Sequence, residues 1–94
     1  MEAVFSQRIF VNTLGQHIDK EVLLRGWVFR LRVLAKTTFV MLRDCSGEAQ
    51  CVAASERIKP LQLKLEDTVE ICGRVRADAR SKWGYEVDIL QAKF

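Results

Sequence analysis

Residues 38–54 read TFVMLRDCSGEAQCVAA, and this stretch decides the fold of the chain. On both sides of its central DCSG, at residues 44–47, apolar side chains alternate with other types. Alternation with a period of two is typical of a half-buried strand, and a glycine at the last position suits a tight turn. The stretch therefore predicts a β-hairpin in which one face is apolar.

The two faces of this hairpin differ in chemistry. The apolar face carries Val40, Leu42, Ala49, Cys51 and Ala53. The other face carries Phe39, Met41 and Arg43 from the first strand and Gln50 from the second. An exposed aromatic ring beside a cation and an amide can stack on a nucleobase and hydrogen-bond to its edge. Packing of Phe39 into a second core, or under a loop, is the structural alternative at this point.

Three further strands are predicted on either side of the hairpin, at residues 21–32, 68–76 and 85–90. They are rich in branched and aromatic residues, which favour strands. Gly26 and Gly73 interrupt the first and second of these strands. A glycine inside a long strand usually marks a bulge or a bend, so both strands are expected to curve sharply.

Two short segments predict helical turns. Residues 12–18 predict one turn capped by Asn12 or Thr13, because both side chains can accept a hydrogen bond from the backbone. Residues 55–65 predict a short connector with a helical turn capped by Ser55. The single proline of the chain lies in this connector and rules out a long helix there.

Together these segments predict an all-β fold, a five-stranded Greek-key barrel with a short N-terminal helical turn and a short connector between strands 3 and 4. The OB-fold is the best-known small barrel of this kind, and it binds oligonucleotides on the face of strands 2 and 3. With 94 residues the chain is expected to hold one domain, residues 1–94, with residues 1–20 as an N-terminal helical extension. Trp27, on the long first strand, is expected in the core.

Charge is segregated along the chain, which has fifteen basic and twelve acidic residues and a net charge of +3. Nine of the basic residues lie in two segments, residues 25–43 and 74–82, and these segments hold one acidic residue, Asp78. A basic surface on an otherwise balanced domain is typical of nucleic-acid binders. Solvated strand edges, where cations discourage aggregation, are the alternative explanation.

Several classes of function are excluded by composition. The single histidine, His17, stands alone in the N-terminal turn, and the five glycines are scattered, so neither a catalytic triad nor a phosphate-binding loop is present. Cys45, Cys51 and Cys72 lack zinc-site spacing and are expected to be free thiols in a reducing cytoplasm. No apolar run approaches the ~20 residues of a membrane span, and no signal peptide is recognisable. These features predict a cytoplasmic binding module without a catalytic, metal or cofactor site of its own.

A family resemblance emerges from the same residues. Residues 26–28 (GWV), Arg32 and residues 39–50 (FVMLRDCSGEAQ) resemble the N-terminal anticodon-binding OB-fold domain of class IIb aminoacyl-tRNA synthetases. The pattern of that family reads roughly GWV, R, then F-x-x-(L/M)-R-D-x-x-G-x-x-Q. Residues 66–75 and 84–87 resemble its fourth and fifth strands. The GW pair is typical of the aspartyl and asparaginyl enzymes; the aspartyl type, including forms that charge both tRNA(Asp) and tRNA(Asn), is the first choice, and the asparaginyl type is the alternative.

The resemblance implies roles for four residues. Phe39 would stack on the central anticodon uridine, Gln50 would hydrogen-bond to the edge of that base, and Arg32 would contact the anticodon bases or backbone. Glu86 matches an acid of the family near the third anticodon base. A supporting basic surface is expected from Arg30, Lys36, Arg43, Arg74 and Arg76.

The chain also departs from the family. Ala35 stands where the turn after the first strand usually carries glycine. The class II catalytic motifs are absent before Phe94, so this chain alone is expected not to activate an amino acid. The resemblance implies a parent ligase that uses ATP and magnesium, with a catalytic domain or dimer partner elsewhere. A free-standing module for single-stranded nucleic acid and a protein-interaction OB domain remain as alternatives.

Overall fold

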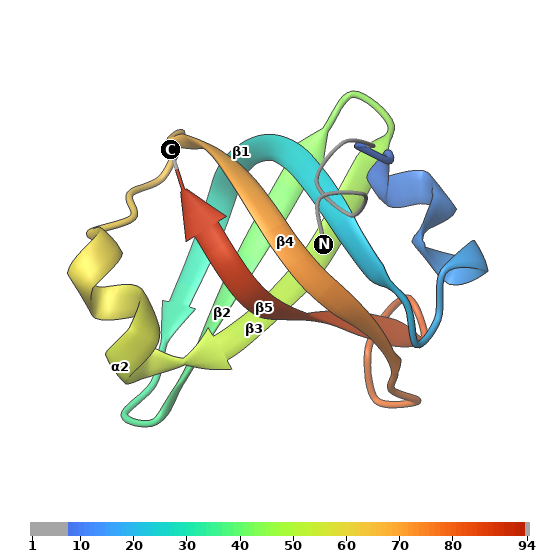
Figure 1. Ribbon diagram of the computed structural model, residues 1–94. Coiled ribbons are helices and arrows are strands. Elements are labelled where there is room, and N and C mark those ends of the chain that lie inside the picture. Colours follow the sequence, from blue (N-terminus) through green and yellow to red (C-terminus); the bar gives the residue numbers. More distant parts are fainter. Residues whose placement is uncertain (1–7, 94) are drawn as a thin grey trace.

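Five strands curl into a closed barrel in the computed structural model, which describes residues 8–93 (Figure 1). They are β1 (Glu21–Val33), β2 (Thr37–Asp44), β3 (Gly47–Ala54), β4 (Thr68–Ala77) and β5 (Tyr85–Lys93). The barrel closes in the order β1-β2-β3-β5-β4, with β3 and β5 parallel and the other neighbouring strands antiparallel. The five-stranded OB-fold expected from the sequence is confirmed.

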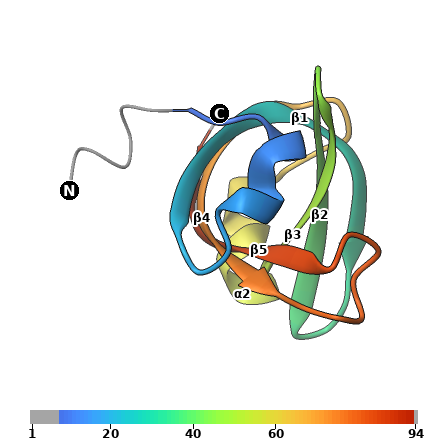
Figure 2. The same cartoon turned by 90° about the vertical axis from the view of Figure 1, so that its right-hand side faces the viewer.

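Short helical pieces cover the two ends of the barrel (Figure 2). The 3-10 helix η1 (Val11–Gln16) lies across one end and buries Val11 and Leu14. The expected helical turn is therefore confirmed, but neither Asn12 nor Thr13 caps it, because Phe10 occupies the N-cap position without a side-chain hydrogen bond. The first seven residues of the expected N-terminal extension lie outside the described residues.

The connector between β3 and β4 contains α2 (Ser55–Ile58) and the 3-10 helix η2 (Lys59–Leu61). Ser55 does not cap α2, because its hydroxyl donates to the Leu34 carbonyl over 2.7 Å and lies 2.8 Å from the Thr38 hydroxyl. Both hydroxyls are buried. This contact links the start of α2 to the loop between β1 and β2.

Strand β1 changes partners along its length. Its first half pairs with β4 and its second half with β2, and Trp27 pairs with both strands. Gly26 lies at this crossing, where an added Cβ would lie 2.3 Å from the carbonyl oxygen of Arg43. Gly73 meets a similar constraint on β4, since its Cβ would lie 2.7 Å from the carbonyl oxygen of Asp88. The two glycines therefore allow the close approach of strands that closes the barrel.

Trp27 is half-buried and does not belong to the core, contrary to the expectation from the sequence. Because Leu24 and Val28 point into the barrel, alternation turns Trp27 outward. Its side chain lines a surface hollow together with Arg8 and Phe10.

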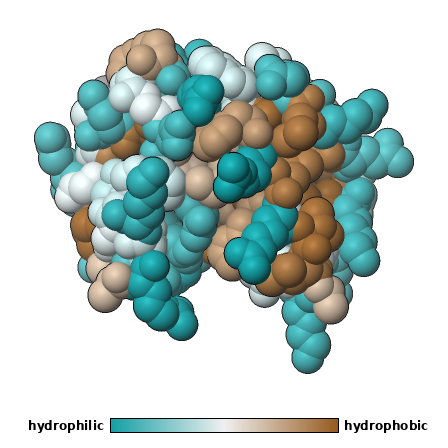
Figure 3. Space-filling model, turned by 180° about the vertical axis from the view of Figure 1, so that it is seen from behind, coloured by the Kyte–Doolittle hydropathy of each residue, from teal (hydrophilic) through white to brown (hydrophobic). Residues whose placement is uncertain are grey.

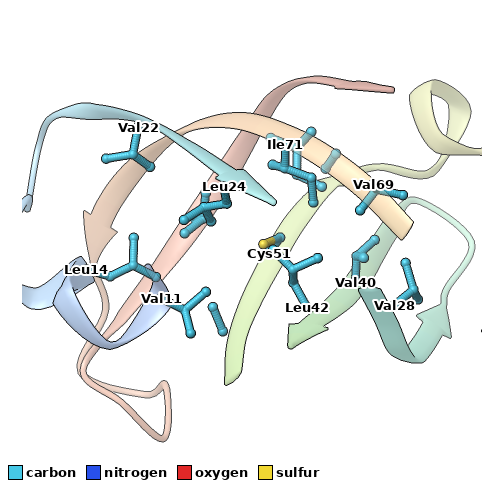
Figure 4. Close-up of a cluster of buried hydrophobic side chains, with 14 of the residues drawn as sticks. Val11, Leu14, Val22, Leu24, Val28, Val40, Leu42, Cys51, Val69 and Ile71 are labelled. Carbon is cyan, nitrogen blue, oxygen red and sulfur yellow. The ribbon is translucent and has the colours of Figure 1, made fainter. Parts of the chain in front are cut away.

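The core fills the inside of the barrel with branched apolar side chains (Figure 4). Its largest fully buried members are Leu14, Leu24, Leu42, Ile71, Val11, Val28, Val40, Val75 and Val87. Cys51 is part of this core, where burial, and secondarily the charge of Glu86, raises the pKa of its thiol to about 12. Cys72 is buried and Cys45 is exposed, and all three cysteines are free thiols. Cys51 therefore behaves as a small apolar side chain.

Asp44 is a buried carboxylate that anchors η1 to the hairpin turn. One oxygen accepts the Val11 amide over 2.9 Å, and the other accepts the amide and hydroxyl of Ser46 over 2.7 and 2.6 Å and the Gly47 amide over 3.2 Å. Burial opposes the charge, but these hydrogen bonds outweigh it and lower the pKa of Asp44 below its ordinary value of 3.8. The folded state therefore favours the ionised form.

Asp44→Asn is expected to lower the free energy of unfolding at neutral pH by about 1–3 kcal/mol, because an amide nitrogen would face backbone donors that need an acceptor. Folding lowers the pKa of Asp44. Its carboxylate therefore contributes fully to the free energy of unfolding above the pKa of the unfolded state, and this contribution is lost as the pH falls through the pKa of the folded state. Urea unfolding of both proteins along a pH series measures this. The difference in the free energy of unfolding between wild type and Asp44→Asn should narrow at pH values below the ordinary pKa of 3.8. A difference that stays constant with pH would contradict the role of the ionised carboxylate.

Candidate nucleic-acid interface

The outward faces of β1, β2 and β3 carry side chains in cross-strand rows. Arg32 on β1 pairs with Phe39 on β2, and in the next row Arg30, Met41 and Gln50 stand on three successive strands. Directly opposed residues on one face of a sheet lie about 4.5–5.5 Å apart at Cβ. The strand register therefore brings together residues that are up to 20 positions apart in the sequence.

These five side chains line one hollow of about 180 Å³. Figure 3 views this side of the barrel and shows hydrophilic side chains that project toward the viewer over a partly hydrophobic surface. Phe39 is half-buried there, and the inward positions beside it are filled by Thr38 and Val40. Three of the four residues that the resemblance assigned to the anticodon, Arg32, Phe39 and Gln50, therefore share one concave surface.

A second hollow of about 400 Å³ continues from the first, because both are lined by Arg30, Met41 and Gln50. Its other lining residues are Phe29, Arg43, Glu48, Lys82 and Trp83. We call the two hollows together the groove face. Trp83 and Lys82 come from the loop between β4 and β5, and the Lys82 ammonium lies 5.3 Å from the centre of the Trp83 ring.

Phe29, Met41 and Trp83 were not among the site residues expected from the sequence. Alternation placed Met41 beside Phe39, and that signal could have identified it. Phe29 precedes Arg30 at a bulge, where the register of β1 against β2 shifts, so simple alternation does not place it. Trp83 lies in a loop without periodicity, and barrel closure brings it to the groove face.

The residues expected to form a basic surface differ in how much charge they expose. Arg30 and Lys36 are exposed, as is Arg32, and within residues 8–93 none of the three forms an ion pair. Arg43 instead donates to Glu48 over 2.6 Å and lies 4.3 Å from the centre of the Phe29 ring. Within the described residues the charge available to a polyanion at and beside the groove face therefore comes from Arg30, Arg32 and Lys36 on β1 and the loop after it, and from the exposed Lys82 beside Trp83.

Arg74 and Arg76 lie on β4, outside both hollows. Arg74 is exposed and pairs across the sheet with Asp88. Arg76 donates to both oxygens of Asp88 over 3.0 and 3.2 Å, to Glu86 over 3.0 Å and to Asp78 over 3.4 Å. The hydrogen bond to Asp88, followed by its charge and by Glu86, raises the pKa of Arg76 despite partial burial. The positive charge of Arg76 is thus balanced by carboxylates of the same chain, so little of it is available to a ligand.

Glu86 is buried on β5 and lines neither hollow. Its carboxylate accepts hydrogen bonds from the amide nitrogen of Gln50 and from Arg76. Glu86 contacts the groove face only through its hydrogen bond to Gln50. The sequence pattern did not reveal this contact.

Metal sites and membrane-spanning helices were also sought in the part of the chain that the structure describes. No group of three or more histidine, cysteine or acidic side chains is placed to hold a metal among residues 8–93. His17 hydrogen-bonds through Nδ1 to the Thr13 carbonyl over 2.9 Å, within its own turn. None of the helices in this range is long and apolar enough to cross a membrane.

Comparison with known families decides the assignment. Residues 22–93 match the model of the tRNA anticodon family, described as an OB-fold nucleic acid binding domain. The chain belongs to this family. It is an OB-fold anticodon-binding domain of the aspartyl and asparaginyl class IIb type, as the resemblance implied.

Sequence relatives of this anticodon-binding domain include two asparagine–tRNA ligases. That of Thermus thermophilus is 32% identical over 88 residues, which cover 87% of this chain and 20% of the ligase. That of Roseiflexus sp. (strain RS-1) is 36% identical over 85 residues, covering 84% of this chain and 19% of the ligase. The chain thus spans about a fifth of the length of these relatives.

Solved structures agree with this placement of the anticodon-binding domain. Asparaginyl-tRNA synthetase from Pyrococcus horikoshii, complexed with asparaginyl-adenylate, matches with a TM-score of 0.80 and 28% identity, over 93% of this chain and 22% of that one. A protein from Leishmania major Friedlin assigned as an aspartyl-tRNA synthetase matches with a TM-score of 0.81 and 26% identity. The match covers 92% of this chain and 20% of that one. An OBody bound to hen egg-white lysozyme, at 20% identity and a TM-score of 0.80, shares the fold alone.

Proposed function

We propose that the groove face binds the anticodon loop of a tRNA and that the chain is of the asparaginyl type. The observation that carries the proposal is the single hollow that gathers Arg32, Phe39 and Gln50 with Arg30 and Met41. A ring, an amide and two cations on one concave surface suit a base with its flanking phosphates.

Each side chain has a role that its chemistry supports. The ring of Phe39 stacks on the central uridine, a contact that all bases permit because each has a π face. The amide of Gln50 hydrogen-bonds to the edge of that base. Arg32, directly opposite Phe39 in the sheet, contacts the anticodon bases or backbone, and Arg30 and Lys36 contact phosphates.

The asparaginyl type replaces the aspartyl type as the preferred assignment because the relatives described above are asparagine–tRNA ligases. In this proposal the chain supplies recognition within a larger cytoplasmic ligase of protein biosynthesis. Aminoacylation, with its ATP and magnesium, and dimer contacts belong to a catalytic domain of that parent protein. We expect no cofactor in the anticodon-binding domain itself.

Anticodon stem-loops of sequence GUU, for asparagine, and GUC, for aspartate, test the proposal by titration against the chain at low salt. Both loops should bind because they share the central uridine, and GUU should bind more tightly. Tighter binding of GUC would overturn the asparaginyl assignment in favour of the aspartyl type. Absence of binding to either loop would overturn anticodon recognition and favour a protein-interaction surface.

Salt dependence offers a separate prediction about Arg30 and Arg32 of the groove face and about Lys36, which lies in the loop between β1 and β2 and outside both hollows. If Arg30, Arg32 and Lys36 each neutralise one phosphate, log Kd should rise with log salt with a slope near 2, at about 0.7 per phosphate for a single strand. Lys36→Ala should lower that slope by about 0.7. Arg25→Ala is the matched control, because Arg25 pairs with Glu70 over 2.6 Å and lines a different hollow. Equal slopes for all three proteins would contradict the phosphate role of Lys36.

A further inference from the structure

The amide of Gln50 has a defined orientation. Its nitrogen donates to one oxygen of Glu86, and the other oxygen of Glu86 accepts from Arg76 over 3.0 Å. A carboxylate paired with a guanidinium accepts hydrogen bonds and donates none. The chemistry of Glu86 therefore requires that Gln50 turn its nitrogen, and not its oxygen, toward the carboxylate.

The carbonyl oxygen of Gln50 then faces away from Glu86. Among residues 8–93 no hydrogen-bond donor contacts this oxygen, and it is not a buried unsatisfied atom, so it is open to solvent. Gln50 lines both hollows of the groove face. The carbonyl oxygen of Gln50 is therefore available to accept a hydrogen bond from a ligand, while one of the two amide hydrogens is engaged by Glu86.

Glu86 is itself held in place. Arg76 bridges it to Asp88, to which Arg76 donates two further hydrogen bonds over 3.0 and 3.2 Å. The Glu86 side chain is only 9% exposed, whereas that of Asp88 is 41% exposed. Register explains the arrangement, because Arg76 lies opposite Glu86 on the neighbouring strand. The orientation of Gln50 on β3 thus depends on the next two strands of the barrel, β5 and β4.

We infer that Glu86, held by Arg76, is a positioning residue that turns the carbonyl oxygen of Gln50 toward the groove face and so selects a base that carries a hydrogen on ring nitrogen N3. Among pyrimidines uracil carries a hydrogen at N3, whereas N3 of cytosine is an acceptor that would oppose the Gln50 oxygen, and the amino hydrogens of cytosine lie at N4, further along the edge. The inference rests on the proposed function, because it assigns the chemical basis of the base preference at the same site. It also gives Glu86 a role other than direct contact with the third anticodon base, which its burial and its two partners disfavour.

Glu86→Gln tests this role with little change in shape. Arg76 should keep the carbonyl oxygen of the introduced amide, whose nitrogen would then face Gln50. Two amide nitrogens cannot hydrogen-bond to each other, so Gln50 should rotate and present its own nitrogen to the groove face. Wild-type protein should prefer a stem-loop with central U over one with central C by about tenfold, the value of one well-formed hydrogen bond. E86Q should reduce this ratio to near one or reverse it.

Asp88→Asn is the matched control. Asp88 binds the same guanidinium but does not contact Gln50, so its variant should keep the U-over-C ratio. A wild-type titration with N3-methyluridine at the centre requires no variant: removal of the N3 hydrogen should lower affinity by about tenfold. Thermal unfolding of both variants confirms that they fold.

The outcomes separate the inference from the proposed function. Wild-type preference for U that persists unchanged in E86Q, or equal losses for U and C, would overturn the positioning role and leave anticodon binding standing. Full wild-type affinity for N3-methyluridine would overturn the acceptor role of Gln50 even if E86Q failed to fold. Equal wild-type affinity for central U and C would overturn both the inference and the reading of the anticodon.

Discussion

Phe39→Ala is expected to weaken binding of an anticodon stem-loop with central U by about 1–3 kcal/mol, roughly 5- to 150-fold in Kd, because one aromatic stacking contact is lost. The ring lines the smaller hollow between Arg32 and Gln50, so its truncation removes the apolar surface on which a base would lie. The fold should persist, because the barrel core on this strand is formed by Val40 and Leu42, both fully buried.

Phe39→Leu distinguishes stacking from general apolar contact. Leucine retains much of the apolar area of phenylalanine but has no π face, so the leucine variant should lose most of the affinity that the alanine variant loses. Isothermal titration with the same stem-loop gives the three dissociation constants, and urea unfolding gives the three stabilities. Unchanged affinity of the folded alanine variant would contradict the stacking role of Phe39.

Gly26→Ala should lower the free energy of unfolding by about 3 kcal/mol or more, at the upper end of overpacking effects. The new Cβ would lie 2.3 Å from the Arg43 carbonyl oxygen, a backbone atom that cannot move without displacing β2. The displaced segment carries Phe39 and Met41, so the groove face should be disturbed as well. At roughly 4–8 °C per kcal/mol for a domain of this size, the melting temperature should fall by about 12–24 °C.

Gly15→Ala is the matched control for this variant. Its added Cβ would lie 3.7 Å from the ring of Tyr85, which is an ordinary van der Waals contact. Its stability should stay within about 1 kcal/mol of the wild type, since no backbone has to move. Thermal and urea unfolding of the two variants compare the sites directly. A Gly26→Ala protein as stable as the wild type would show that β1 does not need this close crossing over β2.

The hairpin was predictable from sequence because its features are local. Alternation through residues 38–54 assigned Val40 and Leu42 to the core and Phe39 to the outer face, and the structure agrees. Gly26 and Gly73 were predictable as bends because a glycine inside a strand signals a local backbone requirement. Motif spacing then identified the family, since Arg32, Phe39 and Gln50 recur in its pattern.

Two of the expectations that were wrong have different causes. Trp27 was expected in the core because of its hydrophobicity, although alternation with the inward-facing Leu24 and Val28 turns it outward. Ser55 was expected as a cap, but its hydroxyl contacts the Leu34 carbonyl in the loop after β1 and the Thr38 hydroxyl on β2. Such pairings arise only when the chain closes on itself.

Ion pairs were likewise predictable from sequence where the partners are close in the hairpin, and not where barrel closure brings distant residues together. Glu48 faces Arg43 within the hairpin, so that ion pair follows from the register of two adjacent strands. The carboxylates around Arg76 include Glu86 and Asp88 on β5, and barrel closure places Glu86 beside Gln50 on β3. A count of basic residues along the chain therefore overestimates the free charge of the groove face.

The most direct test of anticodon recognition measures the affinity of the wild-type chain for four stem-loops that differ only in the central base. The groove face predicts that U binds most tightly, with a discrimination of about 1 kcal/mol or more against each other base, because Phe39 stacks on any base while Gln50 reads one edge. Equal affinity for U, C, A and G would contradict base reading and indicate a surface that binds single strands without regard to sequence.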